Sequence, residues 1–167
     1  MELLLLQIES ALKNHEYFVA LMCTLALPDI CGAIEKSNGK ATKNRYISWY
    51  NTNMLDQRNL TATQCYDFRC RMLHQGISGY NQDSLEKKVI FIYPNNQIRI
   101  DNYRYSNKTK EAICIDLIDF CNTMISSVRH WEAKTKGSPN YIKNINRVIT
   151  IHPNGIFPFI VGFPCIG

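Results

Sequence analysis

The 167-residue sequence lacks a CxxC pair, a glycine-rich phosphate loop and a serine-nucleophile motif. The leucine run at residues 3–6 is too short for a membrane span, and Glu2 precedes it instead of a positively charged start. We therefore expect no membrane segment and a cytoplasmic protein. The missing loop and serine motif argue against P-loop nucleotide hydrolysis and α/β-hydrolase chemistry.

Cysteine occurs seven times, but in no pattern that indicates disulfides or a metal site. The count is odd and the cysteines stand inside apolar stretches, which predicts reduced thiols packed as small apolar side chains. Cys65 and Cys70 fall on one predicted helix, where five positions separate two side chains by about 140°. Because that geometry is poor for tetrahedral zinc, we expect neither a metal nor another cofactor.

Neither sign of charge is in large excess. The chain has 19 Lys and Arg against 14 Asp and Glu, a net charge of +5. This is compatible with a nucleic-acid partner but does not identify one. Hydrophobic residues make up 46% and charged residues 20%, which is typical of a globular chain. At this length we expect one domain spanning residues 1–167.

Apolar residues at helical spacing predict a mainly α protein whose helices pack as an antiparallel bundle. We expect helices over residues 2–26, 28–35, 43–55, 62–75 and 108–137, and residues 138–149 are compatible with one more short helix. The first boundary is placed at Pro28, because a proline disfavours helix in the residue before it.

A β-hairpin is expected to interrupt the bundle at about residues 88–104. The β-branched and aromatic run at 88–93, turn residues at 94–96 and alternation at 97–104 predict two strands. Its tyrosines alternate with Arg99 and Arg104. That pattern suits stacking on single-stranded bases, but a half-exposed hairpin face has the same composition.

The start of the helix at 62–75 is the clearest local signal in the chain. Thr61 and Gln64 form a capping-box pattern, and Gly76 suits the left-handed position after the last turn. Around this helix Arg69 falls inside the apolar arc, whereas Arg71 and His74 fall on the polar side.

Arg69 therefore needs a carboxylate partner, because a guanidinium keeps its charge when it is buried. Asp29, near the start of the helix expected at 28–35, is the first candidate for that partner. Glu35 on the same helix and Glu16 on the helix before it are the alternatives.

The stretch RCRMLH, from Arg69 to His74, resembles the R-x4-H motif of the HEPN superfamily, helical-bundle domains of prokaryotic defence and toxin systems. The resemblance implies a metal-independent RNA endonuclease with Arg69 and His74 as catalytic residues. It also implies RNA as substrate, a cognate antitoxin as partner, and a homodimer in which two motifs share one cleft. Cys70 stands where the family often has Asn, Asp or His.

The residue types suit cleavage of RNA by its own 2′-hydroxyl. A histidine such as His74 can move protons near neutral pH, and an arginine, Arg69 or Arg71, can bind the phosphate. Arg71 and Gln75 are the expected binding residues on the polar face. The alternative is a non-catalytic helical module that binds a protein or nucleic acid, with Arg69 structural and His74 at the helix end, where positive charge suits the helix dipole.

The tail at residues 152–167 places three prolines and three glycines among bulky apolar residues. It cannot form a helix and is too apolar to stay solvated. We expect it to be extended and packed on its own bundle or on a second copy. Because an exposed tail of this kind would form a patch that monomers usually avoid, we predict a homodimer.

Overall fold

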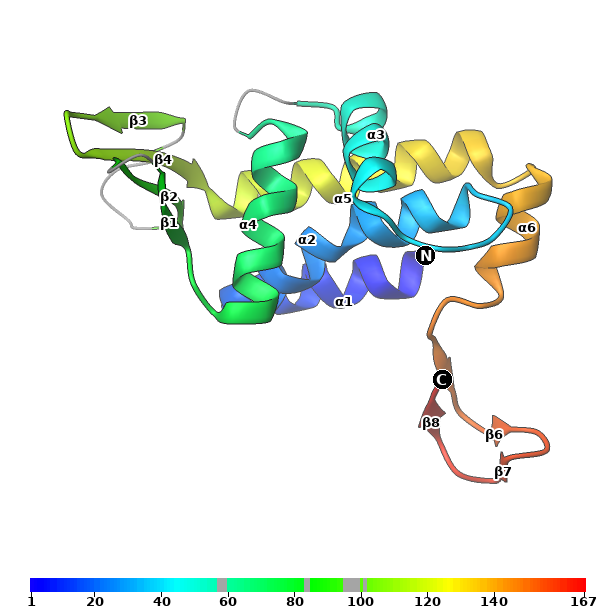
Figure 1. Ribbon diagram of the computed structural model, residues 1–167. Helices are drawn as coiled ribbons and strands as arrows, with labels where there is room; N and C mark the ends of the chain where they lie inside the picture. The colour runs from blue at the N-terminus through cyan, green and yellow to red at the C-terminus, as the bar shows by residue number, and fades with distance from the viewer. Residues whose placement is uncertain (57–59, 83–84, 95–99, 101) are drawn as a thin grey trace.

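The computed structural model describes residues 1–56, 60–82, 85–94, 100 and 102–167, with a helical body, a β-sheet at one end and a C-terminal tail at the other (Figure 1). The described helices are α1 (Glu2–Lys13), α2 (Tyr17–Ile34), α3 (Lys43–Asn53), α4 (Ala62–Gln75), α5 (Leu117–Thr135) and α6 (Pro139–Ile145). The prediction of a mainly α protein is confirmed. Helix α2 lies at the centre of the body and packs against each of the other five.

The break between the first two helices lies earlier than predicted. The expected helices at 2–26 and 28–35 are wrong: α1 ends at Lys13, and α2 then runs unbroken through Pro28. His15 adopts a left-handed φ of 60°, and the N–H of Glu16 donates to the carbonyl of Ala11 at 2.8 Å. This closes a Schellman motif with histidine in the position that glycine usually takes.

Pro28 does not end the helix because its surroundings outweigh its local preference. A proline removes one helical N–H and disfavours helix before it. Its side chain is buried, however, and α2 is covered by neighbouring helices on several sides. Packing supplies most helix stability in proteins, so burial of α2 overrides the local cost. By length and composition alone α2 could also cross a membrane, and 50% of that apolar window is buried within the protein.

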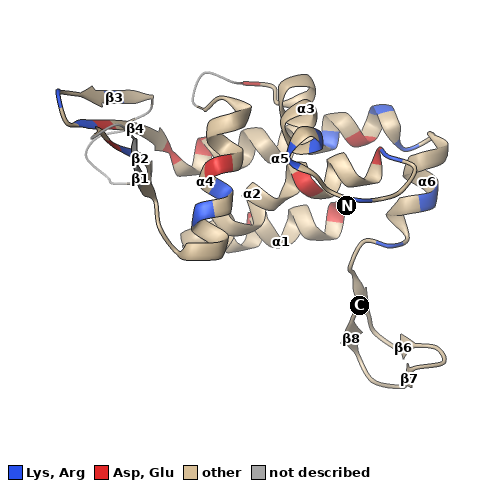
Figure 2. Ribbon diagram, in the orientation of Figure 1, with Lys and Arg blue, Asp and Glu red and all other residues tan. Residues whose placement is uncertain are grey.

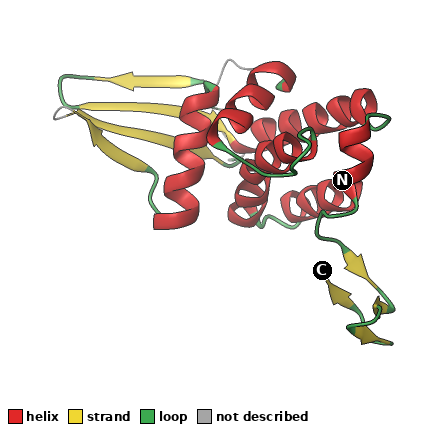
Figure 3. Ribbon diagram, turned by 45° about the vertical axis from the view of Figure 1, so that its right-hand side comes forward, coloured by secondary structure: helices red, strands yellow, loops and turns green. Residues whose placement is uncertain are grey.

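A four-stranded sheet replaces the predicted two-stranded hairpin. The strands are β1 (Gly79–Gln82), β2 (Leu85–Ile92), β3 (Tyr103–Ser106) and β4 (Lys110–Asp116), in the order β1-β2-β4-β3. β2 and β4 pair in parallel at its centre, with Val89 opposite Ile113, and the outer strands are antiparallel. Figure 3 shows the sheet extending from one end of the helices. Most of the expected turn and second strand (95–99 and 101), including Arg99, lies outside the described residues.

The helix expected at 108–137 begins later, at Leu117. Residues 110–116 form β4, with Ile113 and Ile115 buried, and the Asp116 side chain caps α5 by accepting from the N–H of Asp119 at 2.9 Å. The apolar stripe of the helix continues back into the strand, so helical spacing alone did not reveal the change. The short helix compatible with 138–149 is present as α6.

Aromatic side chains form much of the core. Trp49 of α3 packs edge-on against Trp131 of α5, and both are buried. Phe91 of β2 lies between Phe68 of α4 and Phe120 of α5, with ring centroids 5.3 and 5.1 Å away. This chain of rings joins the sheet to α4 and α5.

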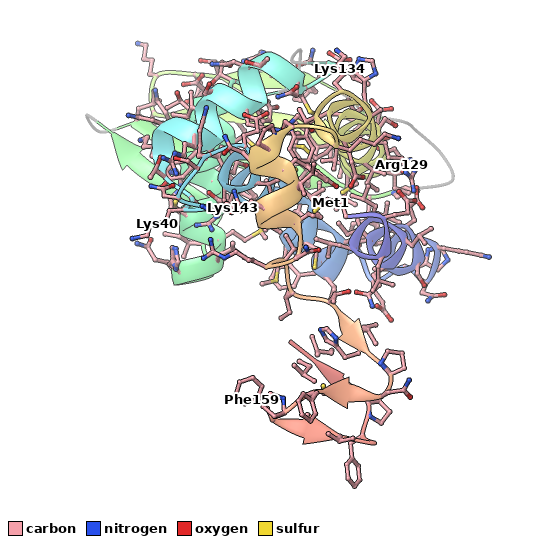
Figure 4. All side chains as sticks on the ribbon, turned by 90° about the vertical axis from the view of Figure 1, so that its right-hand side faces the viewer. Met1, Lys40, Arg129, Lys134, Lys143 and Phe159 are labelled. Atoms are coloured by element: carbon pink, nitrogen blue, oxygen red, sulfur yellow. The ribbon has the colours of Figure 1, made fainter. Side chains whose placement is uncertain are left out.

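The C-terminal tail is extended and projects from the helical body (Figure 1). Its short strands pair within the tail: β5 (Ile151–His152) with β8 (Cys165–Ile166), and β6 (Gly155–Ile156) with β7 (Ile160–Val161). The tail thus consists of short paired strands and turns, and its large apolar side chains are exposed instead of packed on the helices. Figure 4 shows Phe159 out on the tail, where 88% of its surface is exposed.

Candidate functional site

Helix α4 carries both residues of the R-x4-H motif, and its ends form as the sequence predicts. The Thr61 side chain accepts from the N–H of Gln64 at 3.2 Å, and Gln64 Oε1 accepts from the Thr61 N–H at 3.1 Å. Gly76 adopts the left-handed conformation, with φ 69°. The complete capping box and glycine terminus determine where the helix begins and ends, and thereby place Arg69 and His74 on its last turns.

The predicted ion pair between Arg69 and Asp29 is present. Nη2 of Arg69 lies 2.6 Å from Oδ2 of Asp29, with the two side chains 20% and 13% exposed. The alternative partners lie elsewhere: Glu35 accepts from the Trp131 indole at 2.6 Å, and Glu16 is exposed immediately before α2. Burial raises the pKa of the Asp29 carboxyl, and the attraction of Arg69 offsets only part of this effect.

The structure also brings Arg69 to His74. The other terminal nitrogen of the guanidinium, Nη1, lies 3.4 Å from Nε2 of the exposed imidazole. Because a guanidinium only donates hydrogen bonds, Nε2 is the acceptor, and the proton of a neutral His74 is then on Nδ1. Arg69 thus connects a half-buried carboxylate to a solvent-facing imidazole at the end of α4.

A contact between two neighbours of Arg69, Tyr66 and Cys70, was not predicted from the sequence. Cys70 Sγ lies 3.9 Å from Nη1 of Arg69, and its hydrogen bond with the Tyr66 hydroxyl, together with burial, raises the pKa of Tyr66. Lys43 lies over the Tyr66 ring, 5.2 Å from its centroid. Helical spacing could have predicted the contact between Tyr66 and Cys70, because the two residues are four apart and share a face of the helix.

The surroundings of Arg71 and Gln75, the predicted binding residues, differ from those of Arg69 and His74. Arg71 lines a small cavity of about 70 Å³ against the sheet, together with Lys87 and Glu111. Arg71 thus lines a cavity beside β2 and β4, whereas His74 contacts Arg69. Gln75 is exposed at the end of α4.

Two segments rich in basic residues contribute to a cavity on the other side of Asp29. This residue lines a cavity of about 350 Å³ together with Gly39, Asn144 and Arg147. The segments beside that cavity, 36–45 and 143–147, contain six Lys or Arg and no Asp or Glu: Lys36, Lys40, Lys43, Arg45, Lys143 and Arg147. Figure 2 shows the basic positions on the loop after α2 and on α6, and Figure 4 shows Lys40 and Lys143 at this end of the molecule.

Among the residues that the structure describes, no three His, Cys, Asp or Glu side chains are grouped so that they could hold a metal ion. No protein-family model, no curated protein and no solved structure matches the chain.

Proposed function

We propose that the protein is an RNA endonuclease that works without a metal ion, with Arg69 and His74 as its catalytic residues. The observation that carries the proposal is the 3.4 Å approach of Arg69 Nη1 to His74 Nε2 at the exposed end of α4. The R-x4-H resemblance to HEPN proteins points to the same two residues. A prokaryotic defence or toxin role, with a cognate antitoxin, would follow from that resemblance.

In the proposed reaction Asp29 holds one side of the guanidinium, and the substrate replaces the contact between Arg69 and His74 on the other side, which frees Nε2 of His74. Arg69 donates hydrogen bonds to a non-bridging phosphate oxygen and stabilises the charge that develops there. Neutral His74 takes the proton of the 2′-hydroxyl through Nε2 as the 2′-oxygen attacks phosphorus. The 5′-oxygen leaves and takes up a proton from solvent water. The products are a 2′,3′-cyclic phosphate and a 5′-hydroxyl.

The basic segments beside Asp29 supply a route for the RNA backbone. Six cations in 36–45 and 143–147, without an acid among them, attract phosphates in a salt-dependent way. Lys43 extends this charge toward α4, because it lies beside the Tyr66 ring and 3.3 Å from Asp67.

The test is cleavage of single-stranded RNA by the purified protein in the presence of a chelator. We expect His74→Ala to lower the rate by about 100-fold or more, the usual contribution of a general base. His130→Ala is the matched control, because His130 is exposed on α5, away from α4. A substrate with 2′-deoxyribose at the cleavage position should resist cleavage. Equal activity in wild type and His74→Ala would refute the proposal.

A second candidate function is a non-catalytic binding module in which Arg69 only stabilises the fold. The limited exposure of the Arg69–Asp29 pair, 20% and 13%, favours it. In that case wild type and His74→Ala would both leave RNA uncut, and RNA or protein binding would be insensitive to His74.

A further inference from the structure

For its length, the C-terminal tail exposes more large apolar side chains than the rest of the described chain. Phe157 and Phe159 are 85% and 88% exposed, and Val161, Phe163 and Ile166 are each more than 60% exposed. No charged residue occurs after Arg147. A charge-free, aromatic surface of this kind marks a site of contact with another apolar surface.

An apolar groove of matching character lies at the other end of the molecule. It has a volume of about 750 Å³ and runs between the start of α2, the middle of α4 and strand β2. Phe18, Phe68, Met72, Ile77 and Phe91 contribute to its walls. Among the described lining residues, Glu16 is the one acid and no Lys or Arg is present. Phe18 is itself 64% exposed, so the groove is open to a ligand.

The tail and the groove of one chain lie at opposite ends of the body. The tail leaves the end where α6 packs, whereas the groove lies beside the sheet and α4 (Figure 1). The tail also folds back on itself through its paired strands, which shortens its reach. An intramolecular contact between them would require the tail to unfold and cross the body.

We propose that residues 151–167 of one copy dock in this groove of a second copy. The tail is the proposed occupant because both surfaces are apolar: the tail has no Asp, Glu, Lys or Arg, and Glu16 is the one acid in the described lining of the groove. Reciprocal exchange of two tails would close the assembly as a symmetric dimer and cover both apolar surfaces. The inference does not rest on the proposed cleavage of RNA, and its test measures mass rather than activity.

The experiment compares the sedimentation of full-length variants at micromolar concentration. Wild type should sediment as a dimer. Phe157→Asp combined with Phe159→Asp in the tail, and Phe18→Glu in the groove, should each give monomers. All three side chains are exposed in the single chain, so these changes leave its core intact. Leu6→Glu is the matched control, because Leu6 is 51% exposed on α1 and outside the groove, and it should remain dimeric.

Mixing gives a sharper outcome. The tail variant retains an intact groove and the groove variant retains an intact tail, so an equimolar mixture should recover a dimer through one tail–groove contact. A photo-crosslinker at Phe159 should join the tail of one chain to α2, α4 or β2 of the other. A monomeric wild type, dimers that survive both sets of substitutions, or cross-links to a different face would overturn the proposal. Monomers that co-sediment with phosphatidylcholine vesicles would assign the tail to a membrane instead.

Discussion

Two acids that contact an arginine at the same distance have pKa values shifted in opposite directions. Arg69 approaches Asp29, and Arg129 approaches Glu2, each with 2.6 Å between nitrogen and oxygen. The pKa of Asp29 is nevertheless raised, because burial outweighs the attraction of Arg69. The pKa of Glu2 is lowered, because its hydrogen bond to Arg129 outweighs the small effect of burial. Exposure, 13% for Asp29 and 54% for Glu2, explains the difference.

The two arginines also differ in what their donors contact. Arg129 projects from α5 beside α1 (Figure 4) and divides its donors between two carboxylates, Glu2 and Glu9. It thereby ties the two helices together. Arg69 gives one nitrogen to Asp29 and presents the other to His74. Arg69 therefore has one carboxylate partner and a neutral neighbour, whereas Arg129 has two carboxylate partners.

The largest difference between the two contacts should appear on truncation of the arginine. We expect Arg69→Ala to lower the free energy of unfolding by about 3 kcal/mol at neutral pH, because it leaves the half-buried Asp29 without a cation. The loss should shrink in acid, where Asp29 gains a proton and needs no partner. Urea unfolding followed by circular dichroism measures both effects.

A paired substitution separates the ion pair from its geometry. Replacing both partners, Asp29→Asn together with Arg69→Met, should recover much of the stability lost in Arg69→Ala, since no uncompensated charge remains. If Arg69→Ala unfolds at the same urea concentration as wild type, then Asp29 does not depend on Arg69, and the contrast with Arg129 disappears.

Arg129→Ala should cost less, about 1 kcal/mol, because exposed ion pairs contribute little. Salt at about 1 M should remove most of that cost by screening, whereas the cost of Arg69→Ala should persist. Unfolding of the two variants at low and high salt gives the comparison directly. A larger loss at Arg129 than at Arg69 would reverse the ranking that burial implies.

The pH dependence of the two acids should have opposite signs. A raised folded-state pKa means that the stability contributed by Asp29 is fully present below its unfolded pKa, about 3.9, and is lost as the pH rises through the folded value. A lowered folded-state pKa means that the contribution of Glu2 is present above its unfolded pKa, about 4.3, and is lost as the pH falls.

Relative to Asp29→Asn, the wild type should therefore become less stable as the pH rises from below 3.9 toward neutrality. Relative to Glu2→Gln, it should become more stable over the acidic range. Both changes in the free energy of unfolding with pH are expected to be smaller than the loss of stability in Arg129→Ala. Urea midpoints across this pH range measure them, and slopes of the same sign for both pairs would contradict the assignment of burial as the cause.

The features that sequence reasoning predicted correctly are those with local signals. The capping box of Thr61 and Gln64 sets the start of α4, and the position of Arg69 on its apolar arc led to Asp29 as partner. The approach of Arg69 to His74 was not predicted as a contact, because five positions separate the two side chains by about 140° and only the length of the arginine closes the gap.

The features that were missed depend on contacts distant in sequence. β4 pairs in parallel with β2, about two dozen residues away, and its Ile113 continues the helical stripe of α5. Continuation of α2 through Pro28 depends on the helices that cover it. The chain bends after α1 with His15 in a left-handed conformation, which the residue type alone does not predict.

The smallest change in stability is expected at His74, and it separates the two functional candidates most clearly. His74 is exposed and contacts Arg69 at 3.4 Å without taking the place of Asp29, so His74→Ala should change the free energy of unfolding by less than about 0.5 kcal/mol. The Arg69–Asp29 pair remains, and RNA affinity measured by fluorescence anisotropy should stay close to that of wild type. The rate of RNA cleavage should nevertheless fall, because the variant lacks the proposed general base. A stable variant that binds RNA but does not cut it would make His74 a catalytic residue, whereas a large loss of stability would make it part of the fold.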